Sequence, residues 1–231
     1  MDKTNRWRMV AWDLLRVQGR WTIGYIIAFF LINIALHLFL GHLVGDTFNF
    51  LTLSLQSARV FMLIIGLITA THGTKIFVKI GVTRREYFCG NILSTFLLGL
   101  TIILSAVMIH MGLGTLLPGY DMARFLTMAV LLEGLLQVIH FYLVGWLIAM
   151  GFQRFSKFGG IAVIVFNIWF MGQYQYFWTT EGVLENITFG YSFTSSNTSI
   201  TFSLAVIFSL VFSFIILGLI HFISNKLEVQ P

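Results

Sequence analysis

Long apolar runs, separated by charged and turn-forming residues, dominate the chain and occur six times. A helix that rises about 1.5 Å per residue needs about 20 apolar residues to cross a hydrocarbon core roughly 30 Å thick. The runs predict membrane-spanning helices at 22–43, 54–74, 88–112, 124–150, 159–178 and 200–223. We therefore expect an all-α membrane protein with a six-span transmembrane domain over 21–225 and a short tail at 226–231.

The first 20 residues show a different pattern, in which apolar and charged positions alternate at helical spacing. The apolar positions recur every three or four residues, and the charged ones fall mostly on the other side: Trp7, Val10, Ala11, Leu14 and Val17 against Arg6, Asp13, Arg16 and Arg20. This pattern predicts an amphipathic interfacial helix over 1–20 that lies in the membrane surface. It does not resemble a cleavable signal, because it lacks an uninterrupted apolar stretch.

Composition and charge add an orientation to this layout. Hydrophobic residues make up 58% of the chain and charged residues 10%, whereas a soluble domain has about 45–50% and about 25%. Of the 14 Lys and Arg residues, all but Arg59 and Arg124 fall in segments that six spans place on one side. Cytoplasmic segments are enriched in these residues, so we expect both termini to be cytoplasmic. The net charge of +5 then reflects topology and does not indicate nucleic-acid binding.

The cytoplasmic loop at 74–87 concentrates four of the cations. Its pattern predicts a short helix up to residue 80, a stop at Gly81, and a capping box in which Thr83 and Glu86 open the third span. Arg84 and Arg85 occupy the first helical turn, where the macrodipole disfavours cations. We interpret them as facing a partner, although orientation alone or headgroup phosphates would also account for them.

The whole layout resembles the membrane subunit of an ABC exporter of the type-2 superfamily. The resemblance rests on the N-terminal amphipathic helix, the six spans, and the segment GVTRREYF at 81–88. The Phe-rich, Pro-poor composition is similar to permeases of low-GC Gram-positive bacteria, and most specifically to the subunits that export staphylococcal phenol-soluble modulins, which are amphipathic peptides. The resemblance implies a bacterial plasma-membrane protein that pairs with a second permease subunit, identical or homologous, and with cytoplasmic ABC ATPase subunits. It assigns the ATPase contact to the loop residues Lys75, Lys79, Arg84, Arg85 and Glu86.

The sequence lacks the common nucleotide-binding and catalytic motifs. There is no GxxxxGK[ST] loop for a nucleotide, no HExxH and no GxSxG. The single cysteine, Cys89, cannot form a disulfide within the chain or a cysteine zinc site. We therefore expect a subunit without enzymatic activity, catalytic residues, metal or cofactor of its own, with ATP and Mg²⁺ bound by the partner ATPase.

Polar residues within the predicted spans form a second group of candidates. Glu133 lies about 14 Å from Arg124 by helical rise, and a carboxylate at that depth requires a partner, a cavity or a proton. Gln137 and His140 follow on much the same helical face, and Arg59 and His37 lie at depths from which they could pair with Glu133. Three interpretations remain open: a polar lock between helices, a lining of the substrate path, or a proton relay.

Small residues in the spans indicate where helices can approach closely: Gly24 and Ala28 in the first span, and Gly66 and Ala70 in the second.

The sequence thus favours the permease subunit of an ATP-driven exporter for an amphipathic peptide, a lipid or a drug-like molecule. Two alternatives remain, an ATP-independent secondary transporter that uses Glu133 as its ion site, and a non-transporting membrane protein such as an immunity or assembly factor.

Overall fold

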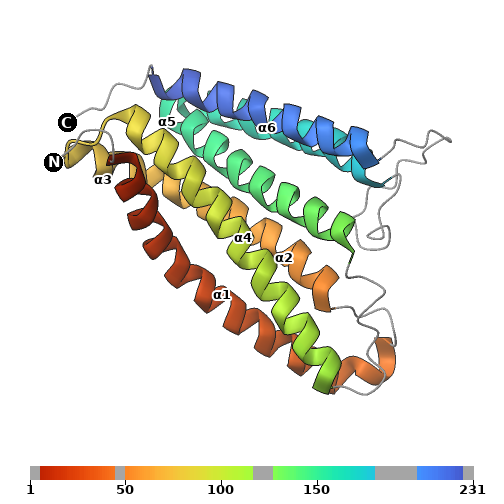
Figure 1. Ribbon diagram of the computed structural model, residues 1–231. Coiled ribbons are helices and arrows are strands. Elements are labelled where there is room, and N and C mark those ends of the chain that lie inside the picture. The colour runs from red at the N-terminus through yellow and green to blue at the C-terminus, as the bar shows by residue number, and fades with distance from the viewer. Residues whose placement is uncertain (1–5, 45–49, 117–126, 180–201, 226–231) are drawn as a thin grey trace.

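The computed structural model describes residues 6–44, 50–116, 127–179 and 202–225, which are helical apart from short turns and contain no β-strand (Figure 1). The elements are α1 (Arg6–Val44), α2 (Phe50–Ile68), the π-helical turn η3 (Thr69–Gly73), α3 (Thr74–Lys79), α4 (Arg84–Leu116), α5 (Met128–Thr179) and α6 (Phe202–Asn225). Helix α2 packs mainly on α5, α1 on α4, and α6 on α5. The start of α1, all of α3 and the end of α6 lie at the same end of the bundle (Figure 1).

The lengths and composition of these helices confirm a helical protein of the multi-pass membrane class. Within the described residues, five helices are long and apolar enough to cross a membrane, at Arg6–Ala35, Leu53–Lys79, Arg84–Thr115, Met128–Phe155 and Phe202–Ser224. A shorter apolar helix follows at Lys157–Trp169, within the predicted fifth span. The count of six spans and the side of the membrane that each end faces stay predictions.

Helix α5 contains two of the predicted spans because it folds back on itself. A Cβ atom placed on Gly151 would lie 2.8 Å from Cγ2 of Val163, although a straight helix would separate residues twelve apart by about 18 Å. Figure 1 shows the second arm returning alongside α6. The reversal lies near Arg154 and Lys157, the two cations that the sequence places between the fourth and fifth spans.

Helix α1 runs without a break through the predicted boundary between the interfacial helix and the first span. The division at residue 20 therefore stays a prediction. The sequence predicts that the apolar positions of this helix lie in the membrane surface. In the structure Val10, Ala11 and Leu14 are instead buried within the protein. Here α1 lies on α4 so closely that a Cβ atom on Gly90 would lie 2.8 Å from the carbonyl oxygen of Trp7. The apolar stripe of residues 7–14 thus packs against protein, and the opposite face is exposed.

Glycines bring the backbones of α2 and α5 into direct contact. A Cβ atom on Gly66 would clash with the carbonyl oxygen of Tyr142, and one on Gly145 would clash with the carbonyl oxygen of Leu63. Close approach at small residues is a principal source of helix association in lipid, where apolar side chains gain little from leaving the solvent. The prediction for Gly66 is therefore confirmed, and Ala70 is fully buried.

The corresponding prediction for the first span is wrong within this chain. Gly24 and Ala28 are exposed, and a Cβ atom on Gly24 would meet nothing within 4 Å. The spacing of small residues was the same in both spans, but only the tertiary packing decides which helix face receives a neighbour.

We expect Gly145→Ala to destabilise the bundle, because the added methyl group can be accommodated only by moving the α2 backbone. Overpacking of this kind costs about 1–3 kcal/mol or more. The matched control is Gly24→Ala, which should be neutral or stabilise by up to about 1 kcal/mol through helix propensity. Thermal unfolding of both variants in detergent, followed by circular dichroism, tests the packing. Equal unfolding midpoints for the two variants would contradict it.

Candidate functional site

The loop between α2 and α4 forms a defined elbow, which we take as residues 74–87. Helix α3 ends at Lys79, and the chain turns at Gly81. The φ angle of Gly81, +82°, lies in the left-handed region that residues with a Cβ atom adopt only at a cost. The N–H of Gly81 donates to the carbonyl of Val78 at 3.0 Å, and that of Val82 donates to Phe77 at 3.0 Å. This pair of hydrogen bonds is a Schellman motif, so the predicted helix stop at Gly81 is confirmed.

The start of α4 carries the predicted capping box. The N–H of Thr83 donates to Oε2 of Glu86 at 2.8 Å, and the N–H of Glu86 donates to Oγ1 of Thr83 at 3.3 Å. The hydroxyl of Thr83 makes a further hydrogen bond of 2.8 Å to Glu86. These bonds satisfy groups that a helix start otherwise leaves open. The chain direction between α3 and α4 is thus fixed by the backbone and by two side chains.

Two hydrogen bonds fasten the elbow to the bundle, and a ring contact of the residue that follows it adds to them. The Tyr87 hydroxyl donates to the carbonyl of Thr69 at 2.9 Å, which ties the first turn of α4 to η3. Nη1 of Arg84 donates to the carbonyl of Ser224 at 3.1 Å, near the end of α6. The rings of Phe88 and His221 lie 5.2 Å apart and join the same two helices. Displacement of the elbow would therefore act on η3, α4 and α6 together.

The cations of the elbow do not share one environment. Lys79 and Arg85 are exposed, whereas Arg84 is half-buried against α6. Arg84 donates to a carbonyl at the C-terminus of α6, where the helix dipole favours cations, and this contact gives a structural reason for its position. Glu86 belongs to the capping box. The side chain of Lys75 lies outside the described residues.

A buried hydrogen-bond cluster lies directly behind the elbow, and sequence reasoning missed it. Nε2 of Gln18 donates to Oγ1 of Thr69 at 2.9 Å and to the hydroxyl of Tyr142 at 3.0 Å. Oγ of Ser94 donates to Oε1 of Gln18 at 2.8 Å, and the Tyr142 hydroxyl donates to Oδ1 of Asn91 at 2.7 Å. We call Gln18, Thr69, Asn91, Ser94 and Tyr142 the polar anchor; it joins α1, η3, α4 and α5. Its signal in the sequence was the set of uncharged polar residues that interrupt apolar runs.

The π-helical turn η3 is held from two sides. Its wider turn weakens the regular ladder of backbone hydrogen bonds, and side chains from two other helices bind its carbonyls. Tyr87 of α4 donates to Thr69, and Nε2 of Gln153 in α5 donates to Ala70 at 3.0 Å. Thr69 belongs to the polar anchor and also binds Tyr87 of the elbow, so it links the two by hydrogen bonds.

The second candidate group lies deeper in the bundle, where Glu133, Gln137 and His140 are all buried. Nε2 of Gln137 donates to Oε1 of Glu133 at 2.9 Å. Arg59 of α2, also buried, is near enough for its charge to act on Glu133. The expected partnership of Glu133 with Arg59 is thus consistent with the structure, whereas the side chain of His37 lies outside the described residues. Burial inside protein favours a polar lock between α2 and α5 over a lining of a substrate path.

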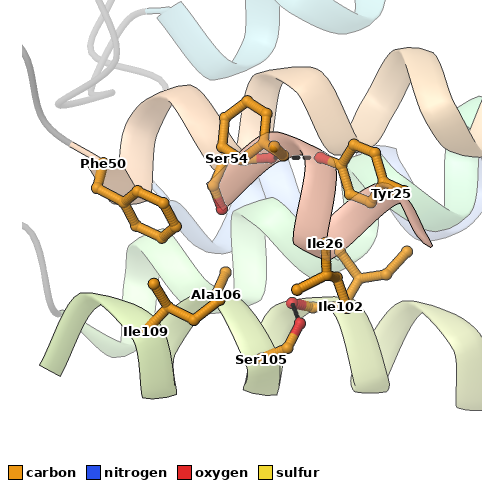
Figure 2. A pocket seen from close by; sticks show the side chains of 9 residues that line it. Tyr25, Ile26, Phe50, Ser54, Ile102, Ser105, Ala106 and Ile109 are labelled. Carbon is orange, nitrogen blue, oxygen red and sulfur yellow. Dashed lines mark hydrogen bonds between the residues drawn. The ribbon is translucent and has the colours of Figure 1, made fainter. Parts of the chain in front are cut away.

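A cleft near the opposite end of the bundle contains none of the predicted site residues. Figure 2 shows its lining, which comes from α1, α2 and α4: Tyr25, Ile26, Phe29, Phe50, Ser54, Ile102, Ser105, Ala106 and Ile109. The cleft is partly open to the surroundings, and the space inside it is about that of one water molecule. Two of its three hydroxyls are bonded within the protein, since Tyr25 donates to the carbonyl of Ser54 at 3.4 Å and Ser105 donates to the carbonyl of Ile102 at 2.8 Å. The lining therefore offers apolar contact and no charge.

We expect Tyr142→Phe to destabilise the protein, because it deprives Asn91 of a donor and Gln18 of an acceptor inside the bundle. A buried group left without its partner costs about 1–3 kcal/mol. Thr101→Val removes an exposed hydroxyl that binds only its own helix, and it should change stability by less than about 0.5 kcal/mol. Thermal unfolding in detergent measures both variants, and a loss no larger for Tyr142→Phe than for the control would refute the role of the polar anchor.

We also expect coupling between Arg59 and Glu133. Arg59→Gln or Glu133→Gln alone leaves one buried charge uncompensated, which costs about 3 kcal/mol. The double variant should recover part of that loss because neither charge remains. A double-mutant cycle on the unfolding midpoint measures the coupling, and additive effects would show that the two residues do not form a lock.

Comparison with protein-family models, curated proteins and solved structures finds no match to this chain. The resemblance to ABC exporter subunits therefore rests on the sequence layout alone.

Proposed function

We propose that the chain is the permease subunit of an ATP-driven exporter, with the elbow as its contact to a separate cytoplasmic ATPase. The observation that carries this proposal is the construction of the elbow. The end of α3 and the start of α4, which meet inside it, are both capped. The elbow is tied to η3 and α6, and it still presents exposed Lys79 and Arg85. A loop that served only to orient the chain would need its cations but not this fixed geometry.

The polar anchor supplies a route for coupling. Thr69 accepts hydrogen bonds from Tyr87 of the elbow and from Gln18 of α1. Gln18 in turn binds Tyr142 and Ser94. A push on the elbow would therefore reorient α1, η3, α4 and α5 as a connected set instead of bending one loop. In this proposal, closure of the ATPases on nucleotide rotates this chain relative to a second permease subunit, identical or homologous.

The chain itself performs no bond chemistry in this proposal, and ATP and Mg²⁺ are bound by the partner ATPase. The exported molecule belongs to the amphipathic class of peptides, lipids or drug-like compounds, in keeping with the apolar and aromatic composition. The protein would act in a bacterial plasma membrane.

A secondary transporter is the second candidate, and one observation favours it. Glu133 is a buried carboxylate beside Gln137 and near Arg59, and such intramembrane groups often serve ion or proton pathways. Transport that follows a proton gradient or the membrane potential and needs no ATPase would support it. An immunity or assembly factor, the third candidate, would show neither transport nor stimulation of an ATPase.

We expect Arg85→Glu to weaken ATPase binding and to uncouple ATP hydrolysis from transport, because reversal of an exposed interface charge costs roughly tenfold in affinity. Lys157→Glu, an equal reversal at the α5 turn on the same side, is the matched control and should retain coupling. The measurement is co-purification of an ATPase with the tagged chain, followed by ATPase activity and uptake into inverted vesicles. Normal coupling in Arg85→Glu, or absence of any co-purifying ATPase, would count against the assignment. Arg84→Glu is less informative because Arg84 also binds Ser224.

A further inference from the structure

The outward face of α1 combines cations with apolar residues in a fixed order along the helix. At about 100° per residue, Trp12, Arg16, Arg20, Ile23 and Ile27 fall within one narrow face. All five are exposed: Trp12 by 60%, Ile23 by 60% and Ile27 by 54%, and both arginines as well. The opposite face, which includes Leu14 and Gln18, is buried against the rest of the bundle. This face is therefore turned away from the protein's own core.

The described part of the chain supplies no partner of opposite charge to the two arginines. Arg16 and Arg20 lie one turn apart, about 6 Å by helical rise, so both guanidinium groups can reach the same anion. No ion pair or hydrogen bond within the described residues holds either of them. Asp13 is exposed on the edge of the same face, and it lowers the net charge of the group without neutralising it.

The order of Trp, Arg and Ile along this face of α1 indicates which kind of anion would fit it. Toward the C-terminus of α1, the same face continues from the arginines to Ile23 and Ile27, which lie in the apolar part of the candidate span Arg6–Ala35. Trp12 lies one turn beyond Arg16, and exposed tryptophans are typical of the headgroup layer. An acidic protein would be matched by the arginines but not by the isoleucines, whereas a phospholipid presents a phosphate directly above acyl chains.

We propose that this face of α1 is a binding site for an anionic phospholipid of the adjoining leaflet, with the headgroup held by Arg16 and Arg20 and an acyl chain on Ile23 and Ile27. Each cation near an anionic membrane surface contributes a factor of roughly five in affinity. The pair therefore gives an anionic headgroup an advantage of roughly 30-fold over a zwitterionic one at low ionic strength. The site does not depend on the exporter function, so it can be tested separately.

Lipid-dependent quenching of a tryptophan placed at the site provides the test. The full chain carrying Ile27→Trp is reconstituted in equimolar phosphatidylglycerol and phosphatidylcholine, with bromine on the acyl chains of one lipid or of the other. The quenching added by the reporter, relative to the chain without it, reports which lipid occupies the site. We expect brominated phosphatidylglycerol to quench more strongly, and Arg16→Gln with Arg20→Gln to make the two lipids equivalent.

The control removes the same number of exposed cations at the same end of the bundle, by Lys79→Gln with Arg85→Gln, and should leave the preference unchanged. Asp13→Asn should increase the preference, because it removes the competing carboxylate. Where the glutamine pair fails to insert, Arg16→Lys with Arg20→Lys keeps both charges, and its preference should disappear at high salt. Equal quenching by both lipids in the parent chain would overturn the proposal. So would a preference that survives loss of both arginines, one that falls equally in the control, or a reporter that neither lipid reaches because a second copy covers it.

Discussion

Polar side chains inside an apolar bundle must satisfy one another, and this constraint organises the end of the molecule that carries the elbow. Gln18 uses both hydrogens of its amide and its carbonyl oxygen in the polar anchor. In lipid there is no water to replace a lost partner, and each such bond in a membrane bundle contributes about 0.6 kcal/mol on average. The anchor joins four elements, because its members come from α1, η3, α4 and α5.

A second kind of contact complements the anchor along the length of the helices. Between α2 and α5 the reciprocal approach of Gly66 and Gly145 holds the backbones together, and buried Arg59 of α2 lies near enough to Glu133 of α5 for its charge to act on the carboxylate. Helix α1 is held on α4 through the close approach at Gly90. Hydrogen bonds thus join the helices at the elbow end of the bundle, and close packing joins α2 and α5 along their length.

The contacts of individual charged residues in the structure differ from those that the sequence alone suggests. Arg84 and Arg85 are neighbours in the sequence, yet Arg84 binds the end of α6 while Arg85 is exposed. Glu133 reads in the sequence as an isolated intramembrane charge, and in the structure it is buried with Gln137 and near Arg59. Arg16 and Arg20, which in the sequence are the polar side of an amphipathic helix, become the exposed face of a helix whose other side is covered. In each case the neighbouring helix decides what the charge contacts.

The features of this protein that could be predicted from its sequence are those that depend on local interactions. The helical spans follow from the length of apolar runs, and the stop at Gly81 and the capping box of Thr83 and Glu86 follow from backbone rules that act within a few residues. The polar anchor could not be predicted, since Gln18 and Tyr142 are 124 residues apart and a polar residue in a span does not reveal its partner. Gly24 and Gly66 were equivalent in the sequence, and only the packing of α2 on α5 made them different. Tertiary structure decided these matters because helix faces are chosen by the total fit of the bundle, which no single segment contains.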